Sequence, residues 1–149
     1  MTKVAAMSGE RIKAEVGARL NQYKDRSVLE QYAMFMGKAQ LLELSLKGLL
    51  ARKFNAPHED MDRWTLGRIK DELRDRGLRP DFIEFLQSVV AHRNNMAHEF
   101  LANVEITRSI AAFSDRKLYG DLFRAIYELE QIIILHDWCE QNDGWLPRA

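Results

Sequence analysis

Apolar residues recur at every third or fourth position over long stretches of this chain, and few residues interrupt them. The 149 residues include only three prolines and eight glycines, and no stretch shows the alternation typical of a half-buried strand. Repeats of three and four residues follow one face of an α-helix. The sequence therefore predicts an all-α fold, a mostly antiparallel bundle of four to six helices. We expect a single domain over residues 1–149, with residues 1–8 flexible.

Capping residues locate the ends of the predicted helices. Ser27 followed by Glu30 forms a capping box, and Gly77 is typical of a helix C-cap. Pro80 suits the first position of a helix, because its missing N–H would lack a helical partner there anyway. With the apolar periodicity, these signals predict helices over residues 12–23, 27–54, 65–76 and 80–104, a last helix from Ser114 or Asp115 to Asn142, and a loop over residues 55–63.

The charge of the chain is balanced, with 22 basic and 22 acidic residues. Proteins that coat nucleic acid are usually strongly basic, so the balance argues against that class but leaves room for a local RNA site. The single cysteine, Cys139, excludes an internal disulfide framework and suits a reducing compartment. The apolar run at residues 132–135 is too short to span a bilayer, and residues 1–9 lack the apolar core of a secretory signal. We therefore expect a soluble cytoplasmic protein.

One short stretch carries most of the functional information, the motif Arg93-Asn94-Asn95-Met96-Ala97-His98. Arginine binds phosphate oxygens through two N–H groups and a permanent charge. Histidine exchanges protons near neutral pH and can act as a general acid or base. Helical spacing brings Arg93 and His98 close enough to serve one phosphate. The motif therefore predicts phosphodiester chemistry, with Asn94 beside the pair.

Helical-wheel positions place ionisable side chains on faces that should be buried. Arg93 falls roughly 20° from Phe82, and Glu43 falls roughly 20° from Tyr32, each within an apolar stripe. Because a buried arginine without a partner is costly, Glu43 is the candidate partner of Arg93. The alternative is that Arg93 extends to the surface and Glu43 lies at an interface edge. His136 also falls on an apolar face, where a hydrogen-bonded core histidine is more common than a catalytic one.

Polar residues on an apolar face also mark subunit interfaces. If the helix that carries the motif packs against its own copy across a two-fold axis, two Arg93 and two His98 side chains line one cleft. That arrangement would concentrate positive charge locally in a chain with no net charge.

The motif resembles the signature of the HEPN superfamily, the higher eukaryote and prokaryote nucleotide-binding domains. That signature is an arginine, four to six residues and a histidine, often with a polar residue directly after the arginine. Here Asn94 follows Arg93, four residues precede His98, and the wording Arg-Asn-x-x-Ala-His is common in prokaryotic members. The segment Trp64-Thr65-Leu66-Gly67-Arg68 is similar to one that precedes the motif helix in several HEPN-like families. The helix plan is similar from about residue 27 to residue 143.

The resemblance implies a homodimer in which the motif helices meet at the two-fold axis. Many members are metal-independent endoribonucleases, and others are non-catalytic nucleotide-binding modules or partners of minimal nucleotidyltransferases. Carried over, Arg93 would hold the scissile phosphate, His98 would be the general base or acid, and Asn94 would position one of them. Asn95 and Glu43 are supporting candidates. The products would be a cyclic phosphate and a 5′-hydroxyl fragment, with no metal and no cofactor.

One position departs from part of the family. Some HEPN toxins carry a tyrosine two residues after the histidine, and a cognate nucleotidyltransferase modifies it. Here that residue is Phe100, which has no hydroxyl, so silencing by that route is not supported. The leading reading is an endoribonuclease in a toxin–antitoxin or phage-defence setting, regulated by another antitoxin or by none. The alternatives are a non-catalytic HEPN binding module and a purely structural dimer in which Arg93 pairs with Glu43.

An acidic cluster directly after Pro57 is less informative than the Arg93–His98 motif. His58, Glu59, Asp60 and Asp62 resemble a metal-ligand set, but they lie beside Pro57 in the predicted loop without a matching set nearby. A solvated loop is the simpler interpretation. We expect no metal site there.

Overall fold

The computed structural model describes residues 8–100 and 115–147, and within these ranges all regular secondary structure is helical. Six α-helices are present in the described part of the chain, so the predicted all-α bundle is confirmed. None of the helices described is both long and apolar enough to cross a membrane.

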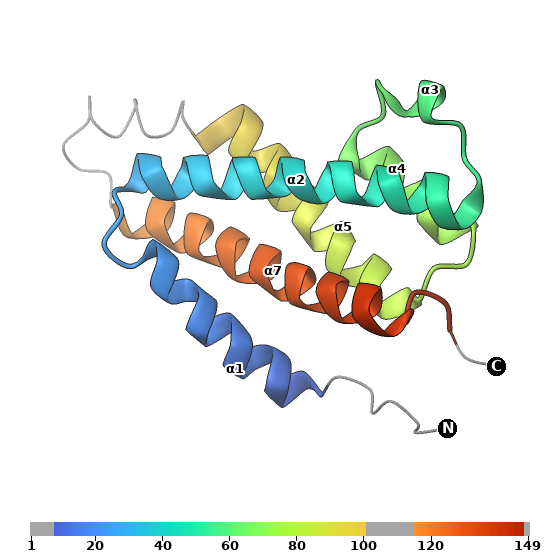
Figure 1. Ribbon diagram of the computed structural model, residues 1–149. Coiled ribbons are helices and arrows are strands. Elements are labelled where there is room, and N and C mark those ends of the chain that lie inside the picture. Colours follow the sequence, from blue (N-terminus) through green and yellow to red (C-terminus); the bar gives the residue numbers. More distant parts are fainter. Residues whose placement is uncertain (1–7, 101–114, 148–149) are drawn as a thin grey trace.

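Four long helices form the body of the molecule (Figure 1). They are α1 (Gly9–Leu20), α2 (Val28–Phe54), α5 (Pro80–Asn95) and α7 (Asp115–Asn142). In Figure 1, α2 and α7 run in one direction, and α1 and α5 run in the other. Consecutive long helices are therefore antiparallel, as predicted, while α2 and α7 are parallel. Because α1, α2 and α5 all contact α7, the last helix is the centre of the bundle.

Shorter elements connect the long helices. A 3₁₀ turn, η1 (Asn21–Tyr23), follows α1, and α4 (Leu66–Asp75) packs against both α2 and α5. The predicted loop over residues 55–63 is wrong in part, because residues 58–61 form one helical turn, α3 (His58–Met61). Pro57 precedes this turn in an extended conformation. The carboxylates of Glu59 and Asp60 lie in the first turn, where the positive end of the helix dipole stabilises them.

The predicted capping signals are confirmed. Ser27 Oγ accepts from the Glu30 N–H at 3.1 Å, and the Glu30 carboxylate accepts from the Ser27 N–H at 3.4 Å. Gly77 has φ of +88°, a conformation that favours glycine, and it ends α4. Pro80 lies at the first positions of α5. Ser8, the one described residue of the predicted flexible segment, caps α1 through its hydroxyl.

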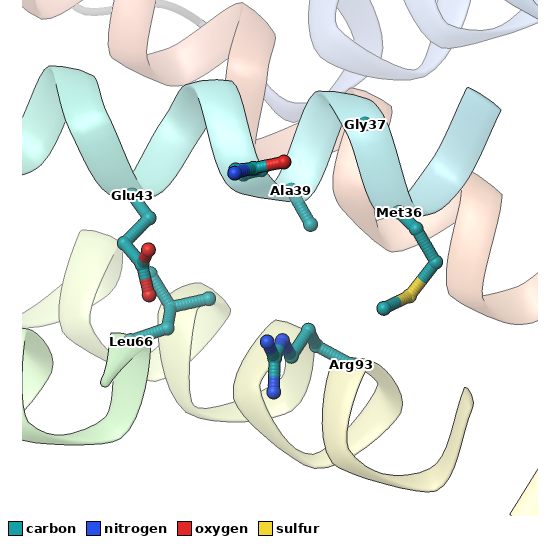
Figure 2. Close-up of a pocket in the computed structure, with 7 residues that line it drawn as sticks. Met36, Gly37, Ala39, Glu43, Leu66 and Arg93 are labelled. Atoms are coloured by element: carbon teal, nitrogen blue, oxygen red, sulfur yellow. The ribbon is translucent and has the colours of Figure 1, made fainter. Parts of the chain in front are cut away.

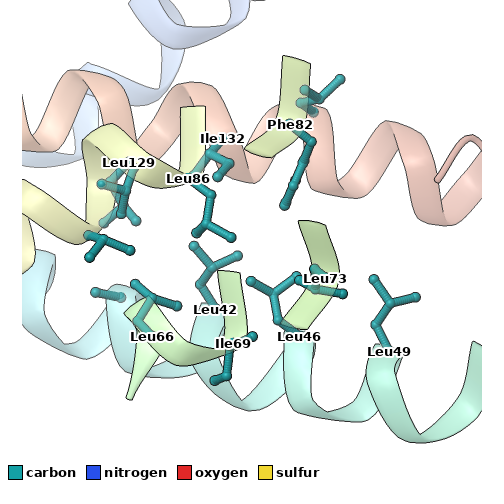
Figure 3. Close-up of a cluster of buried hydrophobic side chains, with 14 of the residues drawn as sticks. Leu42, Leu46, Leu49, Leu66, Ile69, Leu73, Phe82, Leu86, Leu129 and Ile132 are labelled. Atoms are coloured by element: carbon teal, nitrogen blue, oxygen red, sulfur yellow. The ribbon is translucent and has the colours of Figure 1, made fainter. Parts of the chain in front are cut away.

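The hydrophobic core lies where α2, α4, α5 and α7 meet (Figure 3). Its central side chains are fully or almost fully buried: Leu42, Leu46, Leu49, Leu66, Ile69, Leu73, Phe82, Leu86, Leu129 and Ile132. Helix α1 adds a smaller cluster, in which Ile12 and Val16 pack against Ile134 of α7. The apolar stripes read from the sequence are thus the faces that meet in the core.

The predicted helix over residues 80–104 is not regular throughout. The α-helical part ends at Asn95, and residues 96–100 form a π-helical turn, η2 (Met96–Phe100). Residues 101–104 and Ser114 lie outside the described part of the chain. The predicted end of the last helix is confirmed at Asn142, after which Asp143 has φ of +47°. Gly144 is required for a different reason, since a Cβ there would lie 2.5 Å from the Trp138 ring.

Candidate functional site

Arg93 lies in the last turn of α5 and faces a pocket of about 260 Å³ between α2, the start of α4 and α5. The Arg93 side chain extends into the space between α5 and α2, and Glu43 lies across that space on α2 (Figure 2). Arg93 is half-buried, as its position near the apolar stripe suggested. The pocket is lined by Met36, Gly37, Ala39, Gln40, Glu43, Leu66 and Arg93. The fold thus brings Arg93 and Glu43 to one pocket.

The candidate ion pair between Arg93 and Glu43 does not form in this structure. Among the side chains that the structure describes, those of residues 8–57, 59–100 and 120–147, no carboxylate lies within 4.0 Å of the Arg93 guanidinium, and Glu43 has Lys47 as its ion-pair partner at 4.0 Å. Leu66, the first residue of α4, also lines the pocket that the two side chains share. The wheel predicted the direction of both side chains correctly but not the space between them.

His98 lies on the π-helical turn and is exposed to solvent. In a regular α-helix, positions five residues apart differ by roughly 140° around the axis. A π turn joins residues five apart by its hydrogen bonds, so part of the Arg93–His98 interval is wound more widely than in an α-helix. Asn94 is exposed and Asn95 is half-buried. The motif therefore combines one half-buried cation with an exposed imidazole, on a type of turn that is frequent at functional sites.

Phe100 holds the π turn against α2. Its side chain is buried, and its ring stacks on Tyr32 with 5.3 Å between centroids and 9° between planes. Such a stack contributes about 1 kcal/mol beyond the area it buries. Phe100, at the position where some HEPN toxins carry a tyrosine, therefore contributes packing in this protein.

The segment Trp64–Arg68 contributes to the same region. Thr65 caps α4 through its hydroxyl, and the guanidinium of Arg68 lies 4.6 Å from the centre of the Trp64 ring. Leu66 then reaches the Arg93 pocket. Sequence reasoning noted this segment, but it did not identify Gln40 as a neighbour of Arg93. Gln40 lies one helical turn before Glu43, and that spacing was the available signal.

His136 belongs to a different pocket, of about 290 Å³, which Arg19 and Lys38 also line. Its Nε2 lies 2.7 Å from Ser45 Oγ, and its Nδ1 lies 3.1 Å from Asp137 Oδ1. With both ring nitrogens engaged and the side chain mostly buried, it has the contacts of a hydrogen-bonded core histidine.

Sequence reasoning missed a buried carboxylate, Glu130 on α7, whose exposed fraction is 0%. Its Oε1 accepts from the Tyr23 hydroxyl at 2.6 Å and from Lys38 Nζ at 2.6 Å, and Arg19 Nη1 lies 3.6 Å from Oε2. Burial, followed by the hydrogen bond to the carboxylate, raises the pKa of Tyr23 far above its ordinary value. The signal was available, since Glu130 falls four residues after the buried Ile126.

No group of three or more His, Cys, Asp or Glu side chains suited to a metal ion occurs among the residues described. No family model matches the chain, and no curated protein or solved structure is significantly similar to it.

Proposed function

We propose that this chain is a metal-independent endoribonuclease of the HEPN type, acting in the cytoplasm as a homodimer. The observation that carries the proposal is the placement of Arg93. It is a half-buried guanidinium that faces a pocket, with the exposed His98 on the π-helical turn that follows.

The environment of Arg93 suits an anionic ligand. Guanidinium groups bind phosphate oxygens through paired N–H groups, and such charge-assisted hydrogen bonds are strongest where little water competes. Across the pocket, the Gln40 amide can donate to a phosphate oxygen, whereas the Glu43 carboxylate would repel it, so the phosphate would lie on the Arg93 side of the pocket. An RNA phosphate at the pocket mouth would give Arg93 the partner that it does not find in Glu43.

The proposed reaction uses the ribose 2′-hydroxyl as the nucleophile. His98 takes the 2′-hydroxyl proton, the 2′-oxygen forms a bond to phosphorus, and the bond from phosphorus to the 5′-oxygen breaks. A protonated imidazole gives a proton to the departing 5′-oxygen, which leaves a 2′,3′-cyclic phosphate and a 5′-hydroxyl. In a dimer, the two His98 side chains divide the roles of base and acid. Arg93 stabilises the negative charge that develops on the phosphate oxygens, and Asn94 positions one of the two groups.

The setting that we propose is a toxin–antitoxin or phage-defence system. Phe100 supports a form of control other than modification of a tyrosine at that position, because its ring is buried against Tyr32. A protein antitoxin that covers the Arg93 pocket would meet this requirement.

Cleavage of single-stranded RNA by purified protein in the presence of a chelator tests the proposal. We expect Arg93→Ala and His98→Ala each to lower the cleavage rate by about 100-fold or more. The matched controls are Arg74→Ala, an exposed arginine of α4, and His92→Gln on α5, whose Nε2 lies 2.6 Å from Glu128. Both controls should retain wild-type cleavage.

Two results would overturn the proposal. The first is cleavage that persists in both motif variants, which would mean that the activity belongs to a contaminant. The second is wild-type protein that binds nucleotides or RNA without cutting them. That outcome favours the alternative, a non-catalytic HEPN module that partners a minimal nucleotidyltransferase.

A further inference from the structure

Three polar side chains of α2 and α7 form a continuous chain of close contacts in the pocket of about 290 Å³, which we call the His136 pocket. It lies where α1, α2 and α7 come together (Figure 1). Ser45 Oγ lies 2.7 Å from His136 Nε2, and His136 Nδ1 lies 3.1 Å from Asp137 Oδ1. A hydroxyl, an imidazole and a carboxylate in this order have the arrangement of a serine nucleophile, its general base and the group that orients the base.

The carboxylate determines which nitrogen of the imidazole carries the proton. A carboxylate only accepts hydrogen bonds, so the contact with Asp137 places the proton of a neutral imidazole on Nδ1. Nε2 then accepts from the Ser45 hydroxyl, as a general base beside a serine must. The same contacts would hold a purely structural histidine in place, but here both the hydroxyl and the imidazole also reach a cavity.

Neighbouring side chains hold the imidazole and the carboxylate in position. The Trp145 ring packs against the imidazole at 70°, with 5.3 Å between ring centroids. Arg19 Nη2 donates to Asp137 Oδ2 at 3.4 Å, so both oxygens of Asp137 are engaged. The His136 side chain is only 13% exposed. Groups that are fixed before the substrate arrives need little rearrangement during the reaction.

Two cations of the His136 pocket offer N–H groups to a negative charge. Lys38 Nζ donates to Gln22 at 3.0 Å and to Glu130 at 2.6 Å, and an ammonium group has a third N–H. Arg19 donates to Asp137, and a guanidinium has five N–H groups in total. Both cations line the pocket. Their remaining N–H groups can stabilise the oxygen of a tetrahedral intermediate, as the donors of an oxyanion hole do.

The remainder of the His136 pocket favours a small, neutral and partly apolar ligand. Leu41, Leu42 and Ile133 line it together with the polar residues. Two carboxylates beside the two cations balance their charges, so the pocket is less suited to a free phosphate than to a neutral molecule. A carboxylic ester with a short apolar acyl chain fits this combination, because its carbonyl oxygen becomes negative only during the reaction.

We propose that Ser45, His136 and Asp137 form a catalytic site that hydrolyses carboxylic esters with short apolar acyl chains. His136 Nε2 takes the Ser45 proton as Ser45 Oγ bonds to the ester carbonyl carbon. When the bond from that carbon to the alcohol oxygen breaks, the proton passes to the alcohol, and the acyl group stays on Ser45. His136 next takes a proton from water as the water oxygen bonds to the acyl carbon. Ser45 Oγ then leaves with that proton, and the carboxylic acid is released.

Labelling of the purified full chain with a fluorophosphonate tests the nucleophile directly. An activated serine bonds to the phosphorus of this probe with loss of fluoride. We expect mass spectrometry of the digested protein to locate the adduct at Ser45. Ser45→Ala should lose the adduct, whereas Ser88→Ala, at an exposed serine of α5, should keep it. No adduct at Ser45, or equal labelling of Ser88, would overturn the inference.

Hydrolysis of p-nitrophenyl butyrate tests the reaction. We expect Ser45→Ala and His136→Gln each to lower kcat by about 100-fold or more. Asp137→Asn should lower kcat with little change in KM, because Asp137 positions the base and does not touch the ester. The control His92→Gln should keep the wild-type kcat. Ser45→Ala removes a single oxygen, so it keeps the test valid if His136→Gln fails to fold. Wild-type protein without hydrolysis, or hydrolysis that persists in Ser45→Ala, would contradict the proposed site.

This inference does not rest on ribonuclease activity, because the His136 pocket and the Arg93 pocket have no lining residue in common. The two activities are measured on different substrates, so the two proposals can fail separately. A chain that hydrolyses the ester through Ser45 but never cuts RNA contradicts the ribonuclease and leaves the esterase. A chain that cuts RNA through Arg93 but forms no adduct at Ser45 contradicts the esterase and leaves the ribonuclease.

Discussion

Two polar regions on opposite sides of α2 differ in how their charges are matched. Beside α1 and α7, the buried Glu130 accepts two hydrogen bonds at 2.6 Å and has Arg19 close by. Beside α4 and α5, Arg93 and Glu43 line one pocket without an ion pair between them. The first arrangement gives a buried carboxylate two hydrogen-bond donors and a nearby guanidinium, although its Oε2 accepts no hydrogen bond from the described residues. In the second arrangement, the Arg93 guanidinium does not pair with Glu43, so its N–H groups can bind a ligand in the pocket.

The comparison separates stability from function. Removing a member of the Glu130 network should destabilise the fold, because the remaining charged and hydroxyl groups lose a partner in a mostly buried region. Removing Arg93 should weaken ligand binding and catalysis at little cost to the fold, since no carboxylate of the described residues pairs with it.

Glu130→Ala should have the largest effect. It leaves Lys38 and the Tyr23 hydroxyl without their buried acceptor, and breaking such a network costs about 3–5 kcal/mol. For a domain of this size, that loss lowers Tm by about 10 °C, measurable by thermal unfolding followed by circular dichroism. Glu84→Ala, an exposed glutamate of α5, is the control and should keep the wild-type Tm. An unchanged Tm for Glu130→Ala would mean that the network adds nothing to stability.

Tyr23→Phe should have an intermediate effect. It removes one hydrogen bond to a charged acceptor, worth about 2 kcal/mol, while Lys38 still pairs with Glu130. Burial and the neighbouring carboxylate raise the pKa of Tyr23, so its contribution is complete below the ordinary tyrosine pKa of about 10 and is lost as pH rises further. The wild type should therefore lose more stability than Tyr23→Phe between pH 9 and pH 11 in urea unfolding. Parallel pH profiles would contradict this role.

Features of the fold that depend on neighbouring residues could be predicted from the sequence, whereas contacts between distant residues could not. The capping box at Ser27, the left-handed Gly77 and Pro80 at the start of α5 depend on neighbouring residues, so their prediction succeeded. Helical spacing from Ile126 indicates that Glu130 lies on the buried face of α7, but its partners Tyr23 and Lys38 are 107 and 92 positions away, so local spacing could not identify them.

The candidate site was predicted only in part, for a related reason. A helical wheel gives the direction of a side chain around its helix but not the distance across to the next one. It therefore placed Arg93 and Glu43 on facing sides without revealing the pocket that Leu66 and Gln40 share with them. The π-helical turn that carries His98 was also not predicted, because it falls within a run of regular helical periodicity and its Phe100 packs against Tyr32, a residue far away in the sequence.

Asp81→Asn should have a smaller effect and shows what a half-exposed ion pair contributes. Asp81 lies 2.6 Å from Arg79 through each of its oxygens, and this hydrogen-bonded contact lowers the pKa of Asp81. Its contribution is present above the unfolded pKa of about 4 and is lost as pH falls through the folded value. Because Asp81 is 50% exposed, we expect less than about 1 kcal/mol. Urea unfolding should show this loss at pH 7 and almost none at pH 2.

Arg93→Ala should have the smallest effect on stability, although we expect a large effect on RNA cleavage. A buried pair with Glu43 would make the variant several degrees less stable, as the alternative of a purely structural dimer requires. Because the two side chains line one pocket without an ion pair, we expect Tm to change by less than about 2 °C, and Glu43→Gln to behave in the same way. Additive small changes in the double variant, measured by a double-mutant cycle, would indicate no coupling between Arg93 and Glu43. A coupling energy above about 1 kcal/mol would mean that the pair closes in solution, and the contrast with Glu130 would then disappear.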